Sequence, residues 1–150
     1  MTVTTRKASP HEPGATALLR ASHAYLQSLY PPEDNYFLSI DDLCLPSISF
    51  FVAEQNGETI GCGALADKRA YGEVKSMFTA PMARGSGTGA ALMAVLEAEA
   101  RALGLPLMRL ETGDDLYPAH RLYERHGFTH CGPFGDYPEA IHSVFMEKRL

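Results

Sequence analysis

The residues from Arg84 to Gly89 combine the groups that bind phosphate. In the order Arg84-Gly85-Ser86-Gly87-Thr88-Gly89, every second residue is a glycine. Glycines leave the main-chain N–H groups accessible, the two hydroxyls are additional donors, and the guanidinium of Arg84 adds a fixed positive charge. A helix is predicted from Thr88 onward, and its unpaired first N–H groups favour an anion. The segment therefore predicts a phosphate-binding turn.

Three interpretations of this turn stay open on the residues alone. Gly85-x-Gly87-x-x-Ala90 also satisfies the dinucleotide fingerprint, and Glu111 ends the strand predicted next. That fingerprint belongs near the start of a βαβαβ unit, whereas here a predicted antiparallel hairpin precedes it. A pyrophosphate of another cofactor and a simple surface loop are the alternatives. A nucleoside-triphosphate loop is excluded, because no Lys-Ser or Lys-Thr pair follows the glycines.

The cysteines and histidines do not predict a metal site. Cys44, Cys62 and Cys131 are odd in number and lack the C-x-x-C spacing of zinc sites. His120 and His126 are six residues apart, which does not place two ligands on one helix face. A reducing, cytoplasmic environment fits this cysteine content.

The elements that must position the turn alternate between strands and helices. We expect strands over 2–8, 48–54, 59–66, 73–79, 107–112, 128–134 and 143–149, from β-branched and apolar patterns. Asn56-Gly57 predicts a tight hairpin, and residues 135–138 predict the last turn. Helices are expected up to Leu29, from Thr88 to Leu103, and from Pro118 to His126. This order predicts an α+β fold on a mixed sheet.

Composition bounds the classes of function. The chain has 150 residues and a formal net charge of −5, so we expect one domain over 1–150 and no nucleic-acid partner. An apolar run of about 18 residues is missing, so neither a membrane span nor a signal peptide is expected. With a mildly unfavourable overall charge, an anionic ligand needs a dedicated local site.

Taken together, three motifs resemble the GNAT superfamily of N-acetyltransferases, in particular its small bacterial members. They are Val74-Lys75-Ser76-Met77-Phe78-Thr79-x-Pro81, Arg84-x-x-Gly87-x-Gly89 and Ala119-x-x-Leu122-Tyr123-Glu124-x-x-Gly127-Phe128, within residues 48–150. The resemblance implies a mostly antiparallel mixed sheet with helices on both faces. It implies transfer of an acetyl group from acetyl-CoA to a primary amine, here of a small molecule, by direct attack in a ternary complex. A homodimer is common in such a family.

The resemblance also implies where the cofactor lies. The thioester would occupy a gap between the strands 73–79 and 107–112, and main-chain groups would pair with the pantetheine. The implied cofactor contacts are Met77, Phe78, Thr79, Arg84, Gly85, Ser86, Gly87, Thr88, Gly89 and Ala90.

For the chemical step, the resemblance implies a general acid and leaves the base open. Tyr123 occupies the position of the family's acid, which protonates the departing thiolate. Glu73 is the predicted base, with Glu111, Asp136 or a chain of waters as alternatives. The acceptor side would be formed by Tyr30, Asn35, Tyr36, Glu111, Phe134, Asp136 and Tyr137. A non-catalytic acyl-CoA-binding or sensing module and a dinucleotide-dependent oxidoreductase are the rival functions.

Overall fold

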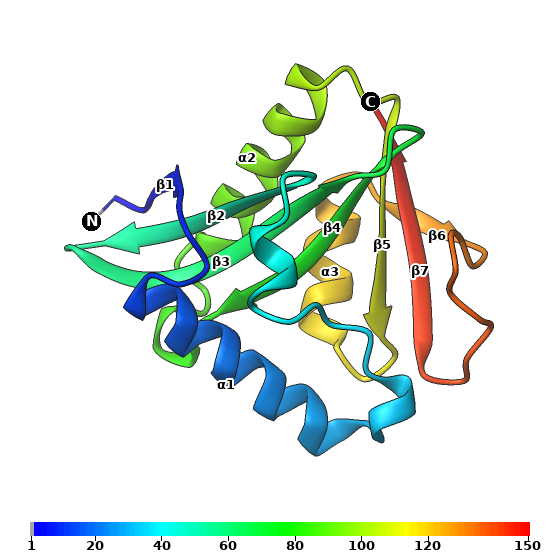
Figure 1. Ribbon diagram of the computed structural model, residues 1–150, viewed down its shortest axis with the longest axis horizontal. Helices are drawn as coiled ribbons and strands as arrows, with labels where there is room; N and C mark the ends of the chain where they lie inside the picture. The colour runs from blue at the N-terminus through cyan, green and yellow to red at the C-terminus, as the bar shows by residue number, and fades with distance from the viewer. Residues whose placement is uncertain (1) are drawn as a thin grey trace.

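The computed structural model describes residues 2–150 (Figure 1). Over this range the elements are β1 (Thr4–Lys7), α1 (Pro13–Leu29), β2 (Ile48–Gln55), β3 (Glu58–Asp67), β4 (Gly72–Thr79), α2 (Thr88–Ala102), β5 (Leu107–Gly113), α3 (Tyr117–Arg125), β6 (Thr129–Cys131) and β7 (Ser143–Arg149). Short 3₁₀ turns lie at Pro32–Asp34, Asp42–Cys44 and Pro81–Ala83. None of the helices within residues 2–150 is long and apolar enough to cross a membrane.

The strands form one mixed sheet in the order β1-β2-β3-β4-β5-β7-β6. Among the described residues, β4 and β5 are the parallel pair, and the other neighbours are antiparallel. The α2 helix connects β4 to β5, as a parallel pair requires. The predicted α+β class with a mostly antiparallel sheet is confirmed.

The sheet is covered on both faces, and strand alternation separates two cores. In β2, Phe50 and Val52 pack with α1, whereas Phe51 and Ala53 pack with α2. Alternate side chains of a strand point to opposite faces, so this one strand contributes side chains to both cores. Figure 1 shows α1 and the 30–47 segment in front of the sheet, with α2 and α3 behind it.

The β4 and β5 strands separate soon after they meet. Their pairing is confined to Gly72 with Met108 and Glu73 with Arg109, while β5 stays paired with β7 as far as Gly113. Below this contact the two strands diverge in Figure 1. The edge of β4 that faces β5 therefore has no strand partner beyond Glu73 within the described chain, and the predicted gap between these strands is present.

A bulge bends β4 beside this gap. In the pairing with β3, Cys62 lies opposite Phe78 and Ala64 opposite Lys75, so two β4 residues oppose the single Gly63. One of them, Ser76, has a φ of 57°. Such a left-handed residue re-aims the main chain locally. The Oγ atom of Ser76 is buried without a hydrogen-bond partner in the structure.

The first strand of the last hairpin is shorter than predicted. A strand over 128–134 was expected, but β6 ends at Cys131 and a loop over 132–142 leads to β7. Pro133 cannot donate a main-chain hydrogen bond to a neighbouring strand, which explains the early end. Phe134 instead turns its ring into the protein. The 2–8 strand is likewise shorter than expected, at Thr4–Lys7.

Candidate active site

One cavity of about 540 Å³ joins the glycine turn, the gap between β4 and β5, and α3. The first helix and the segment after it close the opposite side. Predicted residues that line this cavity are Tyr30, Asn35, Tyr36, Met77, Phe78, Thr79, Arg84, Gly85, Gly87, Gly89, Ala90, Glu111 and Tyr123. Segments that are distant in sequence thus converge on one space.

The glycine turn begins α2 in the geometry of an anion site. Gly85 and Gly87 have φ values of 80° and 87°, in the left-handed region that favours glycine. The first intrahelical hydrogen bond of α2 runs from the Ala91 N–H to the Gly87 carbonyl oxygen. The N–H groups of the three preceding residues, 88–90, therefore lack an acceptor within the helix. They form, with the positive end of the helix dipole, an anion-binding terminus.

The hydroxyls of Ser86 and Thr88 were predicted to be donors to the ligand, but they do not point into the cavity. The Oγ of Ser86 and the Oγ1 of Thr88 lie 2.7 Å apart in a mutual hydrogen bond, and Ser86 also donates to the Ala83 carbonyl oxygen. Thr88 is 1% exposed. A methyl group at Gly61 would meet its Cγ2 at 2.6 Å, so Thr88 faces the sheet. These hydroxyls hold the turn. The Ser86 main-chain N–H also donates within it, to the Ala83 carbonyl oxygen at 3.2 Å, so of these two residues only Thr88 keeps a main-chain N–H without an acceptor in the helix.

The α3 helix places Tyr123 in the gap. Close contact with α2 is possible because Gly89 lacks a side chain: a Cβ there would lie 3.0 Å from the Leu122 side chain. The Tyr123 side chain is buried but lines the cavity. Burial, and secondarily the charge of Glu111, raises the pKa of the Tyr123 phenol above its ordinary value. The phenol therefore stays protonated at neutral pH and can act as a donor.

Glu111 lies near the end of β5 and lines the same cavity. Its carboxylate accepts a hydrogen bond of 2.9 Å from Ser143 Oγ. Burial raises the pKa of this carboxyl, with a smaller contribution in the same direction from Glu73, while Ser143 and the charge of Lys75 oppose the shift. A carboxylate with a raised pKa is a stronger base than an exposed one.

A second hollow, of about 710 Å³, adjoins the cavity on the side of the β6–β7 loop. Of the predicted site residues, Glu73, Asp136 and Tyr137 line this hollow and not the first cavity. Tyr36, Phe37 and Lys75 line both spaces. Glu73, the predicted base, is thus separated from Tyr123 by the residues of this shared wall.

Glu73 is also held by its own partners. It is 4% exposed. The Tyr137 hydroxyl donates to its Oε2 at 2.5 Å, and the Lys75 ammonium lies 3.5 Å from the same oxygen. Both contacts engage the same oxygen of Glu73, and its side chain does not line the cavity that holds Tyr123. Glu111, one of the predicted alternatives, faces the gap together with Tyr123.

The predicted acceptor residues divide between lining and structural positions. Tyr30 accepts a hydrogen bond from the Asp115 main-chain N–H at 3.1 Å, and the Asn35 side chain donates to the Tyr30 and Pro31 carbonyl oxygens at 3.2 Å. Both side chains therefore shape the cavity wall through contacts within the protein.

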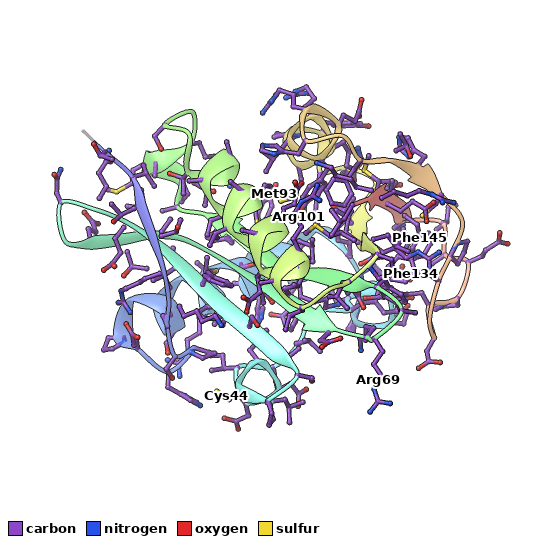
Figure 2. The ribbon with its side chains drawn as sticks, turned by 90° about the horizontal axis from the view of Figure 1, so that it is seen from above. Cys44, Arg69, Met93, Arg101, Phe134 and Phe145 are labelled. Atoms are coloured by element: carbon purple, nitrogen blue, oxygen red, sulfur yellow. The ribbon has the colours of Figure 1, made fainter. Side chains whose placement is uncertain are left out.

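Phe134 lies outside both spaces. It is 7% exposed and packs edge-on against Tyr71, Tyr137 and Phe145. Figure 2 shows Phe134 next to Phe145. Its predicted acceptor contact is replaced by a role as the anchor of the 132–142 loop.

Several lining residues were not predicted. Ser22, His23 and Leu26 of α1 line the cavity, and so do Asp34, Asp115 and Arg125. The polar residues on the apolar stripe of α1 were an available signal, because a stripe that only packs in a core has no need of them. His23 stacks on Phe37 with ring centroids 4.0 Å apart, and its Nε2 is buried without a partner.

Comparison with known proteins agrees with this geometry. Residues 15–128 match the acetyltransferase (GNAT) family. The chain is 44% identical to the "IAA acetyltransferase" of Azospirillum brasilense, over 99% of this chain and 98% of that protein. A Klebsiella pneumoniae protein assigned as an acyl-CoA N-acyltransferase is similar in structure, with a TM-score of 0.84, 32% identity and coverage of 99% and 98%. The fold is also that of yncA from Salmonella typhimurium, solved with acetyl-CoA, with a TM-score of 0.73, 22% identity and coverage of 98% and 93%.

The family match covers the glycine turn, the β4 edge and the α3 helix, which are the three places where the motifs were found. The dinucleotide interpretation of the glycine turn is therefore set aside. On the sequence match, the full-length relative and the shared fold, the chain belongs to the acetyltransferase (GNAT) family of acetyl-CoA-dependent acyltransferases.

Proposed function

We propose that this enzyme transfers the acetyl group of acetyl-CoA to a primary amine of a small molecule, by direct attack within a ternary complex. The observation that carries the proposal is the single cavity that joins an anion-binding helix terminus, an unpaired strand edge and the pair Glu111 and Tyr123. This arrangement supports binding and chemistry in one continuous space.

In this proposal the cofactor lies along the cavity from α2 to the gap. The pyrophosphate meets the free N–H groups at the start of α2, with Arg84 as a neighbouring charge. The pantetheine lies against the unpaired edge of β4, where main-chain groups of Met77 to Thr79 can pair with its amides as an added strand would. The bulge at Ser76 directs a main-chain N–H of Met77 or Phe78 toward the thioester carbonyl.

Glu111 takes the place of Glu73 as the proposed base. An alkylamine is mostly protonated at neutral pH and must lose a proton before it attacks. Glu111 removes this proton, directly or through water, and the amine nitrogen then bonds to the carbonyl carbon. As the tetrahedral intermediate collapses, the carbon–sulfur bond breaks and Tyr123 donates a hydrogen bond, and finally a proton, to the leaving thiolate. The nitrogen loses its second proton as the amide forms, and this proton passes through water to restore the Tyr123 phenol, while Glu111 releases the first proton to solvent.

The cavity wall favours a cationic acceptor. Asp34, Glu111 and Asp115 supply carboxylates on the side of Tyr30 and Tyr36, whereas the arginines Arg84 and Arg125 line the cavity nearer α2 and along α3. A protonated amine is attracted to the acidic side, and the aromatic rings can contact its alkyl or aromatic body.

The decisive experiment follows thiol release from acetyl-CoA with a panel of primary amines. IAA is tested separately, because the Azospirillum relative bears that name. We expect turnover with at least one amine and the acetylated amine as product. Tight binding of acetyl-CoA without turnover on any amine would refute the proposed acceptor class. Comparison of Glu111→Gln with Glu73→Gln identifies the base, because only the variant that removes the base abolishes the pH-dependent rise of kcat/KM.

A further inference from the structure

Lys75 lies on β4 in the wall between the two hollows. Its ammonium contacts the main-chain oxygen of Tyr36 at 3.0 Å, the hydroxyl oxygen of Tyr137 at 2.8 Å and Oε2 of Glu73 at 3.5 Å. Of the three N–H donors of a lysine ammonium, two have hydrogen-bond acceptors within the protein, and the ammonium also forms an ion pair with Glu73. Lys75 is thus bound mainly by groups of the protein itself, although it lines both spaces.

These contacts join two segments that are far apart in sequence. Tyr36 belongs to the segment between α1 and β2, and Tyr137 to the loop between β6 and β7. The two rings meet edge to face, with centroids 5.4 Å apart. We call the contacts of the Lys75 ammonium with Tyr36 and Tyr137 the lysine tie. It closes the wall between the cavity and the second hollow.

Next to the lysine tie lies a buried charge pair. Glu73 and Lys75 are two residues apart on β4, so their side chains leave the same face of the strand. Their side chains are only 6% and 11% exposed. Tyr137 donates to Glu73 and accepts from Lys75, which completes a closed triangle of polar contacts. The burial of Glu73 is therefore explained by its pairing with Lys75 and does not require a role as base.

The same ammonium acts on Glu111. Its positive charge lowers the pKa of the Glu111 carboxyl, against the larger effect of burial. Loss of the charge should therefore let the Glu111 pKa rise further.

We propose that Lys75 is a positioning residue for acetyl transfer: it holds the 30–47 and 132–142 segments together beside the gap and supplies the positive charge that acts on Glu111. The assignment rests on the proposed function, because it treats these segments as the acceptor side and Glu111 as the base.

The test begins with the Lys75→Met variant. This variant loses the hydrogen bonds of the Lys75 ammonium beside the proposed amine site. We therefore expect KM for the amine to rise about tenfold, with KM for acetyl-CoA unchanged. The acid limb of the kcat/KM profile should move to higher pH. Lys75→Arg, which keeps the charge, should restore that limb. Lys7→Met is the matched control: Lys7 is exposed and pairs with a glutamate, Glu99, but neither residue lines the cavity or the second hollow, so every kinetic parameter should stay unchanged.

Two further variants separate the parts of the proposal. Tyr137→Phe breaks the lysine tie but keeps the charge of Lys75, so KM for the amine should rise while the acid limb stays in place. Lys75→Met alone leaves the Glu73 carboxylate buried without its partner and can unfold the chain. The double variant Glu73→Gln/Lys75→Met removes both charges, so no unpaired charge stays buried, and it serves for the KM and exchange measurements. Since Glu73 and Lys75 act on the Glu111 pKa in opposite directions, the acid limb is compared only between wild type, Lys75→Met and Lys75→Arg.

Hydrogen exchange tests the lysine tie without any assay of activity. In Lys75→Met or the double variant, amides of 30–47 and 132–142 should exchange faster, while those of the β2–β3 hairpin keep wild-type rates. Wild-type exchange in both segments would overturn the lysine tie, and an unshifted acid limb would overturn the effect on Glu111. If wild-type enzyme acetylates no amine but the exchange rates rise as expected, the proposed function fails and the lysine tie stands.

Discussion

The Gly87→Glu variant should weaken cofactor binding and leave the protein folded. The φ of Gly87 is 87°, and a Cβ built there has no atom within 4 Å. The cost to folding is therefore backbone strain alone, about 1–2 kcal/mol for a non-glycine residue in the left-handed region. For a chain of this size, this corresponds to a fall in Tm of about 2–8 °C.

The cost to binding is electrostatic. A carboxylate about 4 Å from a phosphate charge costs about 1 kcal/mol with the dielectric constant of water and about 4 kcal/mol with that near a protein surface. The Kd for CoA should therefore rise about fivefold to a thousandfold. Because salt screens charges at the surface, the effect should decrease as ionic strength increases.

Gly57 offers a matched control for this variant. It lies in the β2–β3 hairpin with a φ of 77°, and its Cβ position is equally empty. Gly57→Glu introduces the same strain and the same charge away from the cavity. Thermal unfolding should show similar losses in both variants, whereas titration calorimetry with CoA should show weakened binding only for Gly87→Glu. Equal CoA affinities in the two variants would refute the phosphate assignment of the glycine turn.

Variants at Tyr123, Glu111 and Phe134 test the chemistry and the packing. Tyr123→Phe should lower kcat about a hundredfold or more in steady-state assays, and an unchanged kcat would remove Tyr123 as the acid. In wild type the acid limb of kcat/KM should lie above the ordinary carboxyl pKa of about 4.3, because burial raises the pKa of Glu111, and Glu111→Gln should lose that limb. The folded state binds the Glu111 proton more tightly than the unfolded chain does, so the stability of wild type falls as pH rises through the raised pKa. Urea unfolding should therefore show that Glu111→Gln gains stability relative to wild type between pH 4 and pH 7. An unchanged difference in stability between the two proteins over this range would contradict the raised pKa. Phe134→Ala should lower the free energy of unfolding by about 3–5 kcal/mol, while Ile141→Ala, at a residue 86% exposed, should change it little.

Much of the fold could be predicted because its signals are local. Asn56-Gly57 adopts φ values of 55° and 77°, as expected for its tight hairpin, and Gly85 and Gly87 are left-handed where the turn enters α2. These conformations depend on the residue types themselves. The end of β6 was harder, since Phe134 turns inward to meet Tyr71 and Phe145, and nothing near it in sequence encodes those contacts.

The sequence by itself determined the glycine turn, the succession of strands and helices, and the resemblance that led to acetyl transfer. Only the tertiary structure decided that the hydroxyls of Ser86 and Thr88 bond to each other and that Glu111, rather than Glu73, shares the cavity with Tyr123. The physical reason is distance along the chain. Main-chain conformation is encoded by neighbours in sequence, whereas the role of a carboxylate depends on partners such as Tyr137, which lies 64 residues from Glu73.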